Sequence, residues 1–248
     1  MIGSKGELDT NLVFIKPLRD EMLLGILTNV CYDKIMEFEG LYIGSDEAGK
    51  GDFFGPLVVA AIAINEETIE ILKTIGVKDS KKLSDSKIDL LASVIRQKIP
   101  YDQIVLFPKT YNELYRKFKN LNHLLAWSHA AVIKTLAEKT GATQVLVDQF
   151  TQEPLVDQYL KKKGLKLDLR MYPKAETDIA VAGASILARN AFLEGLKALG
   201  DSIGTPLKKG ASAPVQNQAK EILEIHGEEL FPSIAKLHFK TYKELLGS

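Results

Sequence analysis

Residues 41–61 read LYIGSDEAGKGDFFGPLVVAA, and this stretch is the most informative part of the chain for the fold. A short apolar run ends in two adjacent carboxylates, Asp46 and Glu47. Glycines and a proline follow, and then a second apolar run begins at Leu57. The pattern predicts two strands joined by a glycine-rich turn, with acids at the end of the first strand. Because burying carboxylates is costly unless cations neutralise them, this strand end is predicted to be a site and not core.

Length and composition predict an ordinary globular protein. The chain has 248 residues, of which 46% are apolar and 26% charged, enough for one large α/β domain with a small appendage. Its formal net charge is +0, so a nucleic-acid surface would have to be a local patch. Cys31 is the only cysteine, which argues against disulfides and favours a reducing compartment. With no signal peptide and no run of ~18 to 20 apolar residues, we expect a cytoplasmic monomer that does not bind membranes.

Residues 1–40 are predicted to be a short N-terminal extension or a small remnant domain, and residues 41–248 one larger domain. Expected strands cover residues 41–45, 57–64, 103–107, 144–147 and 167–171. Expected helices cover residues 66–75, a stretch opened by Ser84, 110–118, 124–140, 152–163 and 178–199. Antiparallel strands followed by alternating strands and helices predict an α/β fold, a mixed five-stranded sheet flanked by helices.

Acidic residues stand at the ends of several predicted elements. Asp46 and Glu47 end the first strand, Asp148 ends the strand over residues 144–147, and Glu176 and Asp178 precede an alanine-rich helix. Converging carboxylates without histidine or cysteine suit Mg²⁺ or Mn²⁺ better than zinc. Two such ions, about 3.5 to 4 Å apart, would activate a water and stabilise the leaving oxygen of a phosphodiester.

Each of these features also has a simpler interpretation. Asp148 alone is typical of a turn or a helix N-cap, and Glu176 and Asp178 would favourably face a helix dipole. The turn Gly49-Lys50-Gly51 either brings main-chain amides close to a phosphate or ribose hydroxyl, or is only a tight hairpin. It has neither the P-loop spacing nor the dinucleotide-binding spacing of glycines.

The segment GSDEAGKGDFFGPL, residues 44–57, resembles the signature of type 2 ribonucleases H, and most closely that of ribonuclease HIII. Further similar segments follow in the expected order: DSKKL (79–83), PKTYN (108–112), LAWSH (125–129), VDQF (147–150), KAE (174–176), ASILAR (184–189) and KLHFK (236–240). The resemblance extends from Leu41 to the C-terminus, and its first segment is highly specific.

The resemblance implies an RNase H-like fold that cuts the RNA strand of RNA–DNA hybrids with Mg²⁺ or Mn²⁺, leaving 3′-hydroxyl and 5′-phosphate ends. The four acids of the family, which serve as catalytic and metal-binding residues, correspond to Asp46, Glu47, Asp148 and Glu176. The fourth is Asp in ribonuclease HII and Glu in ribonuclease HIII, so Glu176 favours the HIII type.

The same resemblance implies which residues contact the substrate. Gly49-Lys50-Gly51 matches the HIII version of a Gly-Arg-Gly motif that reads ribose 2′-hydroxyls through the backbone. Lys81, Lys82 and Lys174 are candidate phosphate contacts, with exposed surface charge as the alternative. Ribonuclease HIII usually carries a folded N-terminal substrate-binding domain, and residues 1–40 are predicted to be a reduced version of it or a simple extension.

Other residues are interpreted as structural. Ser185 and Arg189 are expected to pack a helix against the sheet, and His238 to be a satisfied structural histidine. Lys208 and Lys209 are expected to lie in a solvated loop.

Three rival functions remain open. A catalytically silent hybrid-binding protein would have lost one or more of the acids, and none is missing. A ribonuclease HII-type enzyme would incise at single ribonucleotides embedded in duplex DNA. Another RNase H-like nuclease, such as a resolvase, would have no use for a ribose-reading turn.

Overall fold

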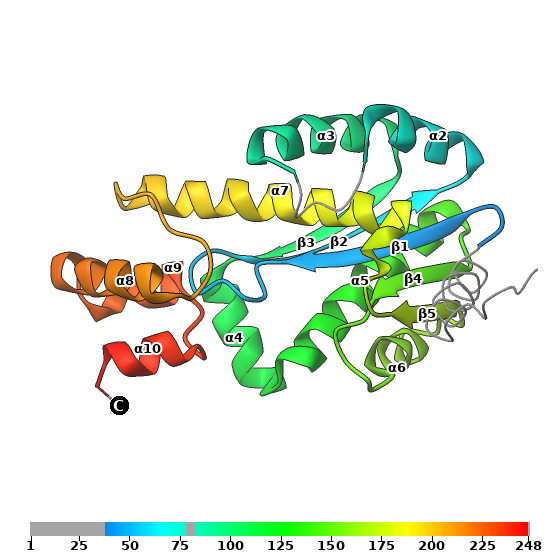
Figure 1. The fold of residues 1–248 in the computed structure, drawn as a ribbon. Coiled ribbons are helices and arrows are strands. Elements are labelled where there is room, and N and C mark those ends of the chain that lie inside the picture. Colours follow the sequence, from blue (N-terminus) through cyan, green and yellow to red (C-terminus); the bar gives the residue numbers. More distant parts are fainter. Residues whose placement is uncertain (1–37, 78–82, 248) are drawn as a thin grey trace, which may run out of the picture. The chain divides into compact units, whose positions relative to one another are not determined.

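The computed structural model describes residues 38–77 and 83–247. Apart from residues 38–40, the predicted N-terminal segment lies outside the described residues, as do Lys81 and Lys82. The strands are β1 (Tyr42–Ala48), β2 (Leu57–Ile64), β3 (Tyr101–Leu106), β4 (Gln144–Asp148) and β5 (Asp168–Tyr172). They form one sheet in the order β3-β2-β1-β4-β5 (Figure 1). The pairs β1–β2 and β2–β3 are antiparallel and β1–β4 and β4–β5 parallel, which confirms the predicted mixed five-stranded sheet.

Local sequence signals account for most helix ends. The helices are α2 (Glu66–Ile75), α3 (Asp85–Lys98), α4 (Pro108–Phe118), α5 (Leu121–Thr140), α6 (Leu155–Lys162), α7 (Ile179–Ser202), α8 (Ala213–His226), α9 (Phe231–Ile234) and α10 (Lys240–Leu245), with 3₁₀ turns η2 (Ala175–Thr177) and η3 (Glu228–Leu230). Asn65 and Thr68 form a capping box at the start of α2, and Ser84 caps α3 as predicted. Asn120 caps α5, which therefore begins three residues earlier than expected.

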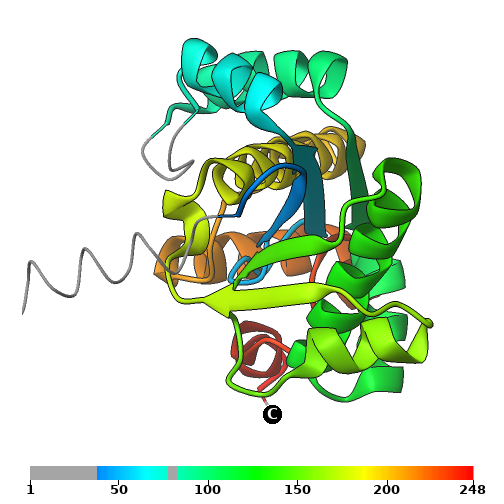
Figure 2. The ribbon, with the colours of Figure 1, turned by 90° about the vertical axis from the view of Figure 1, so that its right-hand side faces the viewer.

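The two faces of the sheet carry separate hydrophobic cores. Side chains of β2 alternate between them, and all eight of its residues are buried, as expected of a strand covered on both sides. Helices α2, α3 and α7 cover one face, and α4, α5 and α6 cover the other (Figures 1 and 2). The catalytic-domain prediction for residues 41–248 thus falls on a sheet with a helical layer on each side.

Helix α7 lies unusually close to the sheet because small residues face each other. A Cβ atom added to Gly44 would stand 2.4 Å from the carbonyl carbon of Ala180, and one on Gly183 would stand 2.5 Å from Cδ1 of Ile62. By length and composition α7 could cross a membrane, but 78% of its most apolar window is buried inside the fold. Its apolar character is that of a core helix.

Two strands extend further than predicted, and this positions the acids. Strand β1 continues through Asp46 and Glu47 to Ala48, and β4 includes Asp148, so these acids lie within strand ends instead of following them. The parallel pairing of β1 and β4 matches Ser45 with Val147. Asp46 and Asp148 therefore occupy the next positions on neighbouring strands, whose axes are about 4.7 to 4.9 Å apart.

Candidate active site

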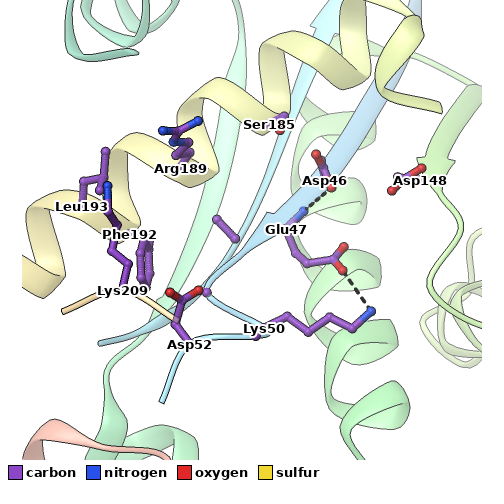
Figure 3. A pocket seen from close by; sticks show the side chains of 13 residues that line it. Asp46, Glu47, Lys50, Asp52, Asp148, Ser185, Arg189, Phe192, Leu193 and Lys209 are labelled. Atoms are coloured by element: carbon purple, nitrogen blue, oxygen red, sulfur yellow. Dashed lines mark hydrogen bonds and ion pairs between the residues drawn. The ribbon is translucent and has the colours of Figure 1, made fainter. Parts of the chain in front are cut away.

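A cavity of about 460 Å³ opens at the ends of β1 and β4. Figure 3 shows the carboxylates of Asp46 and Asp148 directed toward each other, with Glu47 beside them. The cavity is lined by three acids, the glycine-rich turn and residues of α7, namely Asp46, Glu47, Asp148, Ala48, Gly49, Lys50, Gly51, Asp52, Ser185, Arg189, Phe192, Leu193 and Lys209. Three of the four predicted acids, Asp46, Glu47 and Asp148, thus share one cavity with the predicted turn.

Asp46 lies on the α7 face of β1, where no cationic side chain among the described residues contacts its carboxyl. Only 8% of its surface is exposed, and its Oδ1 accepts a 2.7 Å hydrogen bond from the backbone N–H of Glu47. Burial, and secondly the charge of Glu47, raise the pKa of Asp46 to about 8, although a hydrogen bond with Ser185 opposes the shift. Burial and the neighbouring carboxylate therefore dominate the surroundings of Asp46.

Glu47, the next residue, lies on the opposite face of β1 and is surrounded by cationic groups. Its side chain contacts Nε2 of His129 at 3.3 Å and Nζ of Lys50 at 3.4 Å. Burial acts to raise the pKa of Glu47, but the hydrogen bonds and charges of His129 and Lys50 outweigh it, so the pKa lies below its ordinary value. Glu47 is held as a carboxylate.

His129 is a fully buried link between two strand residues. Its Nδ1 lies 2.8 Å from the hydroxyl of Ser45, and that hydroxyl donates its own proton to the carbonyl of Ala60 at 2.8 Å. Its Nε2 lies 3.3 Å from the carboxylate of Glu47, and the ring stacks on Phe150 with centroids 5.2 Å apart.

The third and fourth predicted acids meet at the end of β4. Asp148 Oδ1 accepts a 2.9 Å hydrogen bond from the backbone N–H of Ala175, in the 3₁₀ turn that also carries Glu176. Burial raises the pKa of Asp148, and the charges of Glu176 and Glu47 add to the increase against the effect of the Ala175 amide. Glu176 is not among the cavity-lining residues, but its carboxyl interacts directly with that of Asp148.

The donor set suits a hard divalent cation. All four candidate ligands are carboxylates, and burial and mutual repulsion act to raise the pKa of Asp46 and of Asp148, as expected where a cation is needed for balance. Among the residues that the structure describes, no three acidic or histidine side chains already stand in a metal-binding arrangement.

The glycine-rich turn places main chain along the cavity. Gly49 has φ 85°, and a Cβ there would stand 2.2 Å from the carbonyl oxygen of Pro56, so only glycine fits. Around Gly51 no atom lies within 4 Å of an added Cβ, so its main chain can be approached closely. The turn therefore combines one constrained glycine with one open to a ligand.

A buried lysine, whose role was not foreseen, anchors this turn. Nζ of Lys236 donates to the carbonyls of Asp52 at 2.8 Å and Gly55 at 2.7 Å, and its backbone N–H donates to Phe53 at 2.9 Å. Burial lowers the pKa of Lys236 to about 7, although the charge of Asp52 opposes the shift. The sequence signal was present, since Lys236 opens the KLHFK segment, but nothing local indicated its partners.

Several residues interpreted as structural line the site instead. Ser185 and Arg189 of α7 face the cavity, and so does Lys209, which was expected to lie in a solvated loop (Figure 3). Lys174 is exposed, with φ 61°, next to the turn that binds Asp148. His238 lies outside the cavity lining and contacts Tyr111 and Tyr115, as expected of a structural histidine.

Asp178 belongs to the helix and not to the acidic cluster. It caps α7 by accepting hydrogen bonds from the backbone N–H groups of Ala180 at 2.8 Å and Val181 at 3.2 Å, and it accepts another from the Tyr42 hydroxyl. This is the simpler of the two interpretations available from the sequence.

Comparison with known proteins gives the family. The family model described as ribonuclease HII matches residues 43–242. Ribonuclease HIII of Protochlamydia amoebophila is 50% identical over 206 residues, which cover 83% of this chain and 68% of that protein. Ribonuclease HIII of Chlamydia muridarum is 47% identical over 209 residues, covering 83% and 69% of the two chains.

A solved structure agrees with these sequences. The crystal structure of Bst-RNase HIII in complex with Mn²⁺ superposes with a TM-score of 0.79 at 34% identity, covering 86% of this chain and 71% of that one. The fold, the family match and the curated relatives agree with the type inferred from the motifs. The chain therefore belongs to the ribonuclease HII family and is an RNase H endonuclease of the ribonuclease HIII type.

Proposed function

We propose that this chain hydrolyses the RNA strand of RNA–DNA hybrids, leaving 3′-hydroxyl and 5′-phosphate ends, with two Mg²⁺ or Mn²⁺ ions held by Asp46, Glu47, Asp148 and Glu176. The observation that carries the proposal is the meeting of these acids, from three separate parts of the chain, beside the glycine-rich turn. The crystal structure of Bst-RNase HIII in complex with Mn²⁺ supports the choice of cation.

The acids have different tasks in this proposal. Divalent ions, when bound, would activate a water and stabilise the leaving oxygen of the phosphodiester. Asp46 and Asp148, adjacent on parallel strands, are the central ligands. His129 and Lys50 hold Glu47 ionised and oriented from one side. Glu176 completes the set through its contact with Asp148.

Selectivity for RNA is assigned to the backbone of the turn. Main-chain groups of Gly49, Lys50 and Gly51 would contact the ribose 2′-hydroxyl, which is the group that distinguishes the two strands locally. Lys236 fixes the neighbouring carbonyls of Asp52 and Gly55, so the turn is ordered before substrate arrives. Lys174, exposed beside the acids, is a proposed phosphate contact, and Lys81 and Lys82 keep that role as a sequence-based proposal.

The test compares three end-labelled duplexes of the same sequence: one with a run of ribonucleotides, one with a single embedded ribonucleotide, and one of DNA only. We expect cutting within the run, no cutting of DNA, and loss of cutting in EDTA that Mg²⁺ or Mn²⁺ restores. Polymerase extension of the products would report 3′-hydroxyl ends.

Two outcomes would change the assignment. An intact ribonucleotide run at saturating metal contradicts the proposal. Efficient incision at the single ribonucleotide would instead assign HII-type specificity. A cytoplasmic location and a monomeric state stay predictions from the sequence.

A further inference from the structure

Two of the segments that carry the family resemblance, PKTYN (108–112) and KLHFK (236–240), line no part of the cavity that holds the acids. They contact each other instead. The side chain of Asn112 donates to the carbonyl of Ala235 at 2.9 Å, and its Oδ1 accepts from the backbone N–H of Leu237 at 3.0 Å. Asn112 on α4 therefore holds the chain on both sides of the buried lysine that opens KLHFK.

That lysine, Lys236, is fully buried with its ammonium among carbonyl groups of the glycine-rich turn. Nζ donates to the carbonyls of Asp52 at 2.8 Å and Gly55 at 2.7 Å, and the carbonyl of Phe54 accepts at 3.5 Å. The three protons of the ammonium are thus matched by three carbonyl oxygens. The ring of Tyr111 lies 5.7 Å from Nζ and adds a cation–π contact from α4.

The chain beside this lysine also pairs with the turn through the backbone. Phe54 and Ala235 form an isolated antiparallel bridge, and the N–H of Gly55 donates to the carbonyl of Ile234 at 3.1 Å. The ammonium and the backbone pairing act on the same short stretch. The C-terminal segment therefore holds the far end of the glycine-rich turn.

The residues that are proposed to read ribose lie between two fixed points. Before them, Ala48 is paired with Val58 in the β1–β2 ladder. After them, the N–H of Asp52 donates to the carbonyl of Gly49 at 3.3 Å, and the carbonyl of Asp52 is held by Lys236. The position of the main chain between these points depends on the strand on one side and on the buried ammonium on the other.

We propose that Lys236 is a positioning residue for ribose recognition: held by Asn112 and Tyr111, its ammonium fixes the end of the turn so that the main chain of residues 49–51 meets the 2′-hydroxyl. The inference rests on the proposed function, because it names what holds the ribose-reading turn in place. Hydrogen bonds weaken steeply when their geometry is poor. A turn without its anchor should therefore lose discrimination between ribose and deoxyribose while the sheet stays folded.

The test crosses protein variants with two hybrids that differ by one hydroxyl. A ribonucleotide next to a chosen phosphate is replaced by a deoxynucleotide, on each side of that phosphate in turn. For the parent, we expect loss of the hydroxyl that meets the turn to lower kcat/KM at that phosphate by about 10- to 100-fold. Lys236→Met keeps the apolar stem and removes the ammonium, so the same loss of hydroxyl should matter less than about threefold.

Two further variants separate positioning from simple destabilisation. Asn112→Ala leaves the lysine in place but removes its support, and should give a discrimination between those of the parent and Lys236→Met. Asn65→Ala is the control, because it removes the side chain that caps α2 and accepts from the N–H of Thr68 at 3.0 Å, far from the turn in sequence. It should lower stability yet keep the full discrimination of the parent.

Circular dichroism establishes that each variant is folded at the assay temperature. A merely structural role would lower cleavage of both hybrids by the same factor. Parent-like discrimination in folded Lys236→Met and Asn112→Ala proteins, or an equal loss of discrimination in Asn65→Ala, would overturn the inference.

Hydrogen exchange of the free protein gives a readout that needs no cleavage. The backbone N–H groups of Asp52, Phe53 and Gly55 are hydrogen-bonded, and Lys236→Met should speed their exchange by about tenfold or more while residues paired in β1 and β2 stay protected. If the parent cuts no hybrid, the proposed function fails, yet exchange still decides whether Lys236 fixes the turn. Unchanged exchange at these groups would contradict the positioning role even in an active enzyme.

Discussion

The two faces of the sheet treat adjacent acids on β1 in opposite ways. On the α7 face, Asp46 meets Ser185 and other carboxyls, and its pKa rises to about 8. On the α5 face, Glu47 meets His129 and Lys50, and its pKa is lowered. The backbone positions differ by one residue, so the difference comes from the side chains that surround each carboxyl: Glu47 beside Asp46, and His129 and Lys50 beside Glu47.

This contrast shows how a strand end can become a cation site without unfolding. A site with four uncompensated carboxylates would repel itself, whereas one with every acid neutralised by the protein would have little affinity for metal. Here His129 and Lys50 on the α5 side stabilise the charge of Glu47, whereas Asp46 and Asp148 on the α7 side are left to be neutralised by a bound cation. Four predictions test this division.

The largest effect is expected on catalysis, from the α7-face acids. Asp46→Asn and Asp148→Asn should each lower kcat on a labelled hybrid by about 10³-fold or more, because several kcal/mol of transition-state stabilisation would be lost. Asp157→Asn on α6, where Asp157 pairs with Lys161 at 2.7 Å, is the matched control and should change kcat by less than about twofold. Retained activity in either site variant would remove that acid from the proposed ligand set.

Close packing is expected to matter on the α7 face alone. Gly44→Ala should lower the free energy of unfolding by about 3 kcal/mol, because its Cβ would stand 2.4 Å from Ala180. Gly51→Ala meets no atom within 4 Å and should change stability by less than about 0.5 kcal/mol. Urea unfolding followed by circular dichroism measures both, and similar values for the two variants would contradict the packing argument.

Without divalent cations, the two acids should affect stability with opposite signs. The folded pKa of Asp46 lies above its unfolded value. Between about pH 4 and about pH 8, the folded state therefore keeps a proton that the unfolded state has released, and the free energy of unfolding falls as pH rises through that window. Asp46→Asn removes this loss and should be more stable than the parent at pH 9 in EDTA. Glu47→Gln leaves His129 and Lys50 without their carboxylate and should be about 2 kcal/mol less stable.

The comparison of those two variants is made by thermal unfolding at pH 5 and pH 9. The stability difference between Asp46→Asn and its parent should be much smaller at pH 5 than at pH 9, since the loss begins only above the unfolded pKa of about 4. Mg²⁺ should stabilise the parent at pH 9 but not the Asp46→Asn variant to the same degree. A destabilised Asp46→Asn protein at pH 9 would show that the α7 face does not lack positive charge.

The smallest effect concerns the support of His129 on the α5 face. Ser45→Ala removes the hydroxyl that is hydrogen-bonded to Nδ1 of His129 and should lower the free energy of unfolding by about 1 kcal/mol. Ser128→Ala is the control, because Ser128 is equally buried but donates only to the carbonyl of Leu124 within its own helix. Equal losses in the two variants would indicate that the Ser45–His129 contact contributes nothing specific.

Local sequence predicted several elements to the residue. The expected ranges 57–64 and 66–75 match β2 and α2, because an unbroken apolar run and a capping box leave few alternatives. The predicted end of β1, at Ser45, is too early, because acidic residues that follow an apolar run are typical of the end of a strand. In the structure, Ser185 and His129 contact the two acids from opposite faces, so the strand can continue through them.

The site was predicted unevenly for a related reason. Acids and glycines carry their chemistry in their own side chains or backbone, so Asp148 and the glycine-rich turn could be recognised in isolation. His129 and Lys236 act only through partners 82 and more than 180 residues away, and no local pattern indicates such contacts. Lys209 does lie in an exposed loop as expected, but its contact with Asp85, 124 residues away, could not be predicted from the loop sequence.

From sequence alone follow the mixed sheet, the acidic residue types and the glycine-rich turn, because hydrophobic periodicity and backbone preference act over a few residues. Only the tertiary structure decided which acid is neutralised and which lysine anchors the turn. Those properties depend on burial and on charges from distant segments, and the free energy of a charge is determined by its complete surroundings.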